Sequence, residues 1–145
     1  MTQFIVIVQG IIHAENQILI AKKRLDLPHP LRGEWHFPGG KLKNKEDPYN
    51  AIIREIKEET NLTVRPVKII DIYTHTDSHD LPNNEILNIL HIIFECIPST
   101  NDCKMRPGDD IVEAKWIRAK DIRKFIVKDK LIRRIRIKNL LTYLA

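Results

Sequence analysis

The segment from residue 47 to residue 60 constrains the fold most, because its sequence specifies a helix with two different faces. Asp47-Pro48 is a typical helix start, with the aspartate as N-cap and the proline at the first helical position. The apolar residues that follow at helical spacing are Tyr49, Ile52, Ile53 and Ile56. Asn61 tolerates the left-handed backbone with which many helices end. We therefore predict a helix over residues 47–60 whose apolar stripe packs on a sheet.

Runs rich in isoleucine and valine lie on both sides of this helix and predict strands. The predicted strands cover residues 3–12, 18–21, 35–40, 62–73, 86–97 and 111–117. The predicted connections are a hairpin turn at 13–17, a loop at 24–34 and a polar segment at 74–85. A short helix begins at Asp121, and residues 128–145 favour a helix although part of them alternates like a strand. This order indicates an α/β fold in which a mixed sheet is covered by helices.

The length of 145 residues fits one domain, which we expect to span residues 1–145. The longest apolar runs contain only a few residues, far fewer than the roughly 20 that cross a bilayer. The N-terminus has no basic region before an apolar stretch and therefore does not resemble a signal peptide. Two cysteines are too few for a disulfide framework. We expect a cytoplasmic protein, a monomer or a homodimer, that does not bind membranes.

The net charge of +5 comes from the C-terminal third of the chain. From Lys104 onward the sequence has thirteen Lys and Arg residues against five Asp and Glu residues. Such a segment attracts nucleic acid, nucleotide phosphates or an acidic partner, or it forms a solvated helical surface. We expect it to serve packing or phosphate steering, and we do not expect sequence-specific binding of nucleic acid.

Three carboxylates gather on one side of the predicted helix. Glu55, Glu58 and Glu59 fall within a sector of about 100° at the angular spacing of an α-helix. Like charges at this spacing destabilise an isolated helix by a few tenths of a kcal/mol per pair. One way to offset the repulsion is an ion pair with Arg54 or Lys57. The other is a hard divalent cation such as Mg²⁺, which binds carboxylate oxygens.

The residues around this cluster follow a longer pattern. The loop Phe37-Pro38-Gly39-Gly40-Lys41 precedes the helix, and residues 40–62 contain Gly40, Glu46 and then Arg54-Glu55-Ile56-Lys57-Glu58-Glu59-Thr60-Asn61-Leu62. This segment resembles the Nudix box, the signature of the Nudix hydrolases, at every fixed position except Asn61, where the family usually has glycine. The resemblance extends to the hairpin, to Trp35-x-Phe-Pro-Gly-Gly and to Glu113-x-x-Trp116, so it covers most of residues 3–125.

The resemblance implies a Nudix fold and the metal-dependent hydrolysis of a nucleoside diphosphate linked to another moiety. It implies that the metal is Mg²⁺, with Mn²⁺ as a possible substitute. The implied metal ligands are Glu55, Glu58, Glu59 and the carbonyl of Gly40. Arg54 matches the arginine that orients the neighbouring glutamate, and Glu46 matches a position that supports the loop before the helix.

The remaining site residues are expected from their positions along the chain. Lys23 and Arg24 end the second strand beside the loop, and Lys41 ends the glycine loop, so we expect these cations to contact phosphate. Phe37, Trp35 and Tyr73 are candidates for stacking on a base, although at least two of them are expected in the core. Glu55 is the expected general base, and Glu113 is the competing candidate.

Two groups of histidines are expected to have structural roles and not to bind metal. His75 and His79 have the spacing of metal ligands, but no cysteine or third histidine lies nearby, so we expect a polar loop rather than a zinc site. His91 lies within an apolar strand, and we expect it to be a hydrogen-bonded core residue.

Several functions are compatible with the sequence. The leading hypothesis is a MutT-like hydrolase of nucleoside triphosphates, and the second is hydrolysis of ADP-ribose or a nucleotide sugar. A pyrophosphohydrolase acting on RNA 5′ ends is supported only by the basic C-terminal segment. A catalytically silent module that binds nucleotides or RNA is a further alternative. The three intact glutamates argue against it, because a pure binding module has no use for clustered carboxylates.

Overall fold

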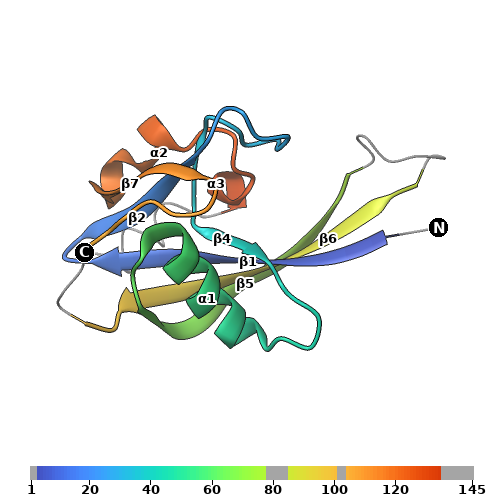
Figure 1. Cartoon of the computed structure of the whole chain (residues 1–145), viewed down its shortest axis with the longest axis horizontal. Helices are drawn as coiled ribbons and strands as arrows, with labels where there is room; N and C mark the ends of the chain where they lie inside the picture. The colour runs from blue at the N-terminus through green and yellow to red at the C-terminus, as the bar shows by residue number, and fades with distance from the viewer. Residues whose placement is uncertain (1–2, 78–84, 101–103, 135–145) are drawn as a thin grey trace.

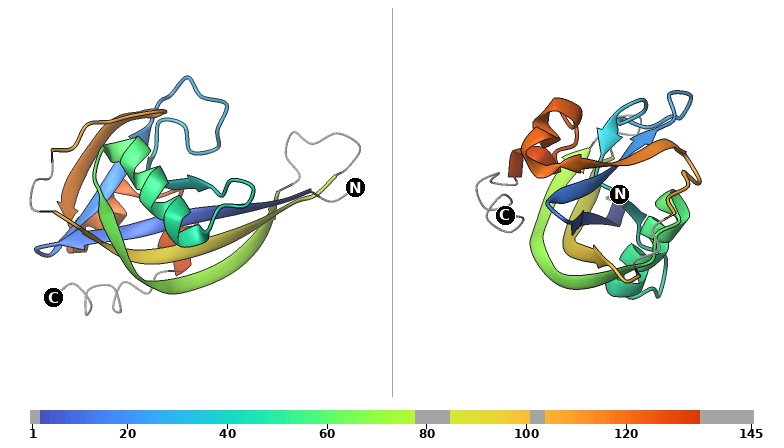
Figure 2. Two further views of the ribbon diagram at one scale, coloured as in Figure 1. Left: turned by 60° about the horizontal axis from the view of Figure 1, so that its bottom comes forward. Right: turned by 90° about the vertical axis from the view of Figure 1, so that its left-hand side faces the viewer.

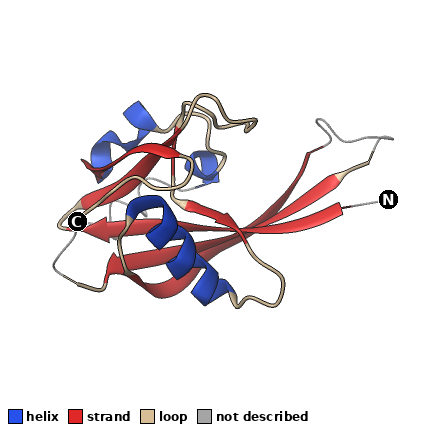
Figure 3. Cartoon of the chain, viewed as in Figure 1, coloured by secondary structure: helices blue, strands red, loops and turns tan. Residues whose placement is uncertain are grey.

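The computed structural model describes residues 3–77, 85–100 and 104–134, which form a mixed β-sheet with helices on both sides (Figures 1 and 3). The strands are β1 (Gln3–Ala14), β2 (Gln17–Lys23), β3 (Trp35–His36), β4 (Gly39–Lys41), β5 (Val64–Asp77), β6 (Leu87–Pro98) and β7 (Ile111–Arg118). The helices are α1 (Pro48–Thr60), the 3-10 turn η2 (Ala119–Asp121), α2 (Ile122–Phe125) and α3 (Leu131–Arg134).

Strand β1 organises the sheet because it pairs with three other strands. It runs parallel to β6, with partners from Gln3↔Leu87 to Ile12↔Cys96, and antiparallel to β2 and β4. The strand order is β3-β2-β1-β6-β5, and β7 pairs with β2. The predicted mixed sheet is therefore confirmed, and β4 places the glycine loop directly beside the middle of β1.

The two faces of the sheet carry separate hydrophobic cores. Helix α1 covers one face through Ala51, Ile52 and Ile56, which pack with residues such as Val8 and Phe94. On the other face, α2 and α3 contribute a second group of buried residues: Ile122, Ile126, Leu131 and Ile132. The views in Figure 2 show these helices and α1 on opposite sides of the sheet. The predicted arrangement of a sheet between helices is thus confirmed.

The ends of α1 follow the sequence prediction. The Asp47 side chain accepts a hydrogen bond from the backbone N–H of Tyr49 at 2.8 Å, as an N-cap does. Asn61 ends the helix in the left-handed region with φ of 67°, and its backbone N–H donates to the carbonyl of Lys57. Asparagine therefore supplies the helix end that glycine usually supplies in the signature.

Strand β5 is longer than predicted, and this corrects part of the connection expected at 74–85. Residues Thr74 to Asp77 continue the strand and pair with Leu90 to Leu87 of β6. Threonine favours strands, and His75 hydrogen-bonds His91 across the pair at 3.0 Å. His91 is buried and also contacts Gln9, so the expectation of a hydrogen-bonded core histidine is confirmed. His79 lies outside the described residues.

The C-terminal part agrees with the sequence as far as it is described. Helix α3 falls within the segment 128–145 for which a helix is favoured, and residues 135–145 lie outside the described part. None of the described helices is long and apolar enough to cross a membrane.

Asp129 fastens the C-terminal segment to the sheet, which generates a stability prediction. Its buried carboxylate accepts hydrogen bonds from the Gln9 side chain at 3.0 Å, from the Phe37 backbone N–H at 3.2 Å and from the Leu131 N–H at 3.0 Å. Asp129→Ala leaves three donors without their acceptor and should lower the free energy of unfolding by about 2–3 kcal/mol. Urea denaturation measures this change. Asp129→Asn keeps one acceptor oxygen and should cost less, and equal losses in the two variants would contradict the explanation.

Candidate active site

The glycine loop lies in direct contact with the carboxylates of α1. The Gly39 backbone N–H donates to Glu59 Oε1 at 2.7 Å. A Cβ atom at Gly39 would lie 2.7 Å from the Cα of Gln9, and one at Gly40 would lie 2.7 Å from Glu55 Oε1. Gly39 therefore requires glycine, because the backbone of β1 occupies the space of a side chain, whereas a side chain at Gly40 would displace the Glu55 carboxylate. The structure thus places Gly40 against Glu55.

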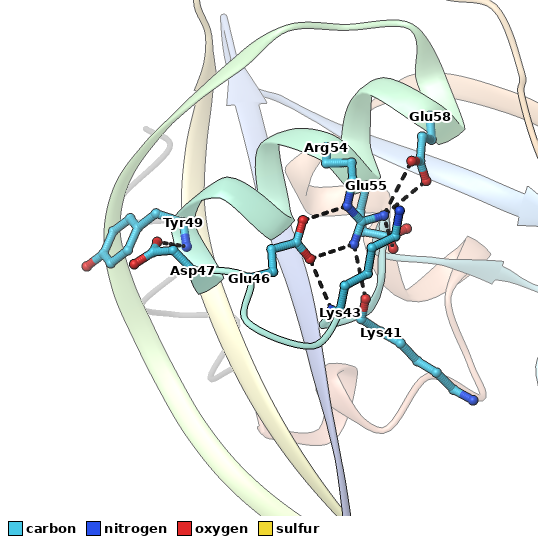
Figure 4. A network of polar contacts seen from close by, with 8 residues as sticks. All are labelled: Lys41, Lys43, Glu46, Asp47, Tyr49, Arg54, Glu55 and Glu58. Atoms are coloured by element: carbon cyan, nitrogen blue, oxygen red, sulfur yellow. Dashed lines mark hydrogen bonds and ion pairs between the residues drawn. The ribbon is translucent and has the colours of Figure 1, made fainter.

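Arg54 links the loop, the start of the helix and the acidic cluster (Figure 4). Its Nε and Nη2 donate to the two carboxylate oxygens of Glu46 at 2.7 and 2.9 Å. Its Nη1 donates to Glu55 Oε1 at 2.8 Å and to Glu58 Oε2 at 3.2 Å, and Nη2 also donates to the carbonyl of Lys41. Arg54 therefore offsets the repulsion within the cluster, whereas Lys57 donates to the Asn61 carbonyl instead.

The shared guanidinium affects the carboxylates differently. Hydrogen bonds from Arg54 lower the pKa of Glu46 to about 2. Burial raises the pKa of Glu55, and the charges of Glu59 and Glu58 add to this effect while Arg54 opposes it. A carboxylate with a raised pKa is a better proton acceptor, which agrees with the predicted role of Glu55 as a base.

Glu59 is the most deeply buried member of the cluster. Its side chain is 2% exposed, and its Oε2 lies 3.5 Å from His36 Nε2, which is also buried. Among the described residues, Glu59 Oε2 and both ring nitrogens of His36 have no hydrogen-bond partner. A buried carboxylate oxygen without a donor is unfavourable, and a bound cation would remove the penalty.

The donor chemistry of this cluster fits a hard divalent cation. Glu55, Glu58, Glu59 and the carbonyl of Gly40 offer the oxygen ligands that Mg²⁺ prefers. In the arrangement described, no three His, Cys, Asp or Glu side chains converge closely enough to hold an ion, because Arg54 engages Glu55 and Glu58. The metal site therefore remains a prediction that requires these side chains to turn from Arg54.

The loop before β7 adds a further carboxylate, that of Asp109. The backbone N–H of Gly108 donates to the Glu59 carbonyl at 3.0 Å, and that of Arg106 donates to the Thr60 carbonyl. These bonds hold Asp109 at the end of α1, where its carboxyl group lies near that of Glu58. Partial desolvation and the charges of Glu58 and of the adjacent Asp110 raise the pKa of Asp109. Asp109 therefore belongs to the cluster.

Glu113 does not reach this cluster, which corrects its expected role as an alternative base. It lies on β7 opposite Lys22 of β2, and paired residues point to the same side of a sheet. Lys22 lies over the ring of Trp35, which packs on the core beneath α2 and α3. Glu113 therefore faces away from α1, because side chains alternate along the strand and the adjacent Ala114 packs in the core beneath α1.

The three predicted phosphate contacts have different surroundings. Lys23 is 7% exposed and pairs with Asp110 at 3.0 Å. Burial favours a raised pKa for Asp110, but Lys23 outweighs it and keeps that pKa below its usual value. Arg24 pairs with Asp26 at 3.1 Å, whereas Lys41 is exposed and its side chain extends away from the carboxylates (Figure 4).

Phe37 is a core residue, so the expectation that it stacks on a base is not supported. Its side chain is fully buried and packs in the core beneath α2 and α3 together with Tyr73. Trp35 is only partly buried, with Phe125 and the ammonium of Lys115 against its ring. The expectation that at least two of the three aromatic residues pack in the core is confirmed.

The basic C-terminal third contributes to packing in its described part. Besides Lys115, whose ammonium lies 4.3 Å from the centre of the Phe125 ring, Lys124 pairs with Asp121 and Lys128 pairs with Glu34. These contacts agree with the packing role that the sequence analysis expected.

Asp109 and His36 were the residues that sequence reasoning undervalued. The turn Gly108-Asp109-Asp110 stands directly before the last strand, and glycine there permits close approach to the Glu58 carbonyl. His36 lies between Trp35 and Phe37, so alternation along the strand turns it to the face of α1. Both signals are present in the sequence, but they can be interpreted only once the pairing of the strands is known.

Comparisons with known proteins identify the family. The profile of the NUDIX domain matches residues 1–135. An ADP-ribose pyrophosphatase of Methanocaldococcus jannaschii is 31% identical over 111 residues, which are 77% of this chain and 60% of that protein. An 8-oxo-dGTP diphosphatase of Proteus vulgaris is 34% identical over 80 residues, which are 55% of this chain and 66% of that protein. The chain thus matches less than two thirds of the length of both relatives.

Solved structures share the fold. A MutT protein from Methanosarcina mazei Go1 has a TM-score of 0.70 at 18% identity, with 99% of this chain and 94% of that chain covered. A MutT NUDIX hydrolase from Burkholderia pseudomallei has a TM-score of 0.71 at 20% identity, with coverage of 94% and 97%. Because the profile of the NUDIX domain matches residues 1–135, almost the whole chain, the chain belongs to the Nudix family, whose members hydrolyse phosphoric anhydrides.

Proposed function

We propose that this protein is a MutT-like pyrophosphohydrolase that cleaves a nucleoside triphosphate with the help of Mg²⁺. The observation that carries the proposal is the acidic cluster of α1, in which Arg54 holds Glu55 and Glu58 while a buried oxygen of Glu59 has no hydrogen-bond donor among the described residues. Nudix hydrolases generally use divalent metal ions, and the oxygen donors of this cluster favour Mg²⁺ over softer ions.

The cytoplasm is the proposed location. In support, the thiol of Cys96 is free and buried, and burial raises its pKa to about 12, so it stays protonated and unreactive.

The chemistry requires charge neutralisation and a positioned water. When bound, the metal ion neutralises phosphate oxygens and makes the attacking water a better nucleophile. Glu55 accepts the proton of that water, since its pKa is raised by burial while Arg54 fixes the direction of its carboxylate. Lys41 is exposed at the end of the glycine loop, and its side chain would turn toward the cluster to contact the outer phosphates.

A second candidate substrate is ADP-ribose. It is favoured by the match to the archaeal ADP-ribose pyrophosphatase, which covers 77% of this chain. A catalytically silent binding module is less well supported, because the residues that would bind metal and accept a proton are all present.

A substrate screen with product analysis tests the proposal. The purified protein is incubated with nucleoside triphosphates, ADP-ribose, nucleotide sugars and RNA with a 5′-triphosphate, each with Mg²⁺ and with a chelator. We expect a nucleoside monophosphate and pyrophosphate from a triphosphate, and loss of this product with chelator. AMP and ribose phosphate as the main products would favour the second candidate, and no turnover of any substrate would favour the binding module.

Metal binding gives a prediction that does not depend on the substrate. Calorimetry with Mg²⁺ or Mn²⁺ should show binding that Glu58→Gln and Glu59→Gln each weaken at least severalfold, because each removes an anionic oxygen ligand. Glu113→Gln is the matched control, since its carboxylate lies on the other face of the sheet. Unchanged affinity in both cluster variants would contradict the metal assignment.

The role of Glu55 gives a kinetic prediction. Glu55→Gln should keep the fold and lower the single-turnover rate at saturating Mg²⁺ by about 10²–10⁴-fold, which is the usual contribution of a positioned base. Arg54→Ala should lower the rate less, because it leaves the base in place while removing the hydrogen bond that orients it. Asp109→Asn should have an intermediate effect, since Asp109 touches the cluster through Glu58.

Two results would overturn the assignment of the base. If Glu113→Gln is more damaging than Glu55→Gln, the position of Glu113 in the structure does not represent the working enzyme. If additional metal restores the rate of Glu55→Gln, Glu55 is a ligand only.

A further inference from the structure

The outer edge of β5 carries an unusual series of exposed apolar side chains. Val67, Ile69, Ile70 and Ile72 are 42%, 37%, 37% and 55% exposed within a stretch of six residues. Figure 2 shows β5 as the outermost strand of its side of the sheet, and among the described residues no strand pairs with its free edge. Exposed edges of this kind invite pairing with another strand.

The irregular pairing of β5 with β6 explains why these side chains are exposed. The register shifts between Pro66 and Lys68 and again between Ile69 and Asp71, so Val67 and Ile70 have no partner residue on β6. Bulges increase the twist of a strand and limit the length of any regular ladder along its edge. A partner at this edge is therefore restricted to a short segment.

The sequence of this segment is complementary to itself in the antiparallel direction. Residues 67–72 read Val-Lys-Ile-Ile-Asp-Ile. The bulge at Ile70 puts Lys68 and Asp71 on the same face of the sheet, since their partners on β6 are Glu95 and Ile93. When two copies are related by a two-fold axis between Ile69 and Ile70, Lys68 of each copy therefore lies opposite Asp71 of the other. The same register places Val67 opposite Ile72, and Ile69 opposite Ile70. All apolar residues then meet apolar residues, and each cation meets an anion.

We propose that a second copy of this chain binds at residues 67–72 of β5, forming a homodimer with a two-fold axis between Ile69 and Ile70. Charge complementarity selects the second copy as the occupant, because oppositely charged residues directly across two strands stabilise the pair and like charges destabilise it. Lys68 and Asp71 also have partners within the protomer, so the new ion pairs are shared with existing contacts.

The proposed contact uses the same patch on both protomers, as two-fold dimers do. Six residues make a short edge compared with interfaces that bury roughly 1,200–2,000 Å². The dimer is therefore weak, and its population rises with protein concentration. The contact does not involve β4 or the carboxylates of α1, so the dimer stands independently of the proposed substrate.

Charge exchange tests the register directly. Sedimentation velocity of the full chain over a concentration series should show a monomer–dimer equilibrium. Lys68→Asp places a carboxylate opposite Asp71 of the other copy at both ends of the contact. Asp71→Lys likewise places an ammonium group opposite Lys68 at both ends. Each change should weaken dimerisation about tenfold or more. The double variant, Lys68→Asp with Asp71→Lys, restores opposite charges and should return the dissociation constant to near its original value.

A second pair of variants guards against loss of folding, because Lys68 also lies opposite Glu95 within the protomer. Ile70→Lys places a charge at the centre of the contact and should abolish the dimer. Val127→Lys is the matched control, since Val127 is 57% exposed and lies outside β5. The control should leave the dimer intact, and circular dichroism checks the fold of every variant.

Three results would overturn the proposal. The first is a monomer at every concentration. The second is a dimer that the double variant fails to restore while it remains folded. The third is a monomer whose β5 amides are protected from hydrogen exchange to the same extent at every protein concentration. Another part of the same chain would then cover the edge.

Discussion

The close contact between the Gly39-Gly40 backbone and its two neighbours is the constraint on which the site depends. Strand β4 pairs with β1 on one side, and its glycines touch the carboxylates of α1 on the other. A side chain at Gly39 would meet the backbone of β1, and one at Gly40 would meet the Glu55 carboxylate. At this point the sheet and the helix are therefore joined by contacts between the glycine backbone and the two carboxylates. This contact fixes where Glu55 and Glu59 stand relative to the loop.

Charge balance is the second requirement of the site. Glu55, Glu58, Glu59 and Asp109 bring negative charge to the end of α1, and Arg54 is the cation that the described contacts place among them. Arg54 is itself fixed by two hydrogen bonds from its guanidinium to Glu46, which leaves one nitrogen for the cluster. Arg54 thus satisfies only part of the negative charge, and the remaining carboxylate oxygens are those that the proposed metal ion would bind.

The sequence predicted those features that depend on local chemistry. Asp47, Pro48 and Asn61 determine the ends of α1 through capping and left-handed geometry, which short-range rules describe well. The direction of Glu113 could not be predicted, because the sequence does not show which face of β7 lies beneath α1; in the structure Ala114 and Trp116 take that face and Glu113 takes the other. Asp109 was undervalued for a related reason. Its position depends on hydrogen bonds from the loop before β7 to the end of α1, and these join residues about fifty positions apart.

Burial shows in which direction the aromatic and basic side chains near the site point. Phe37 begins the glycine loop, and Lys23 directly precedes the loop at 24–34. Both side chains point into the protein, where Phe37 packs in the core and Lys23 pairs with Asp110. Proximity along the chain therefore indicates the neighbourhood of the site but not the direction of a side chain. A strand such as β3 sends successive residues to opposite faces, so His36 reaches Glu59 while Trp35 and Phe37 reach the other core. The chemistry of the site is thus decided by the pleat of a two-residue strand and by the two glycines that follow it.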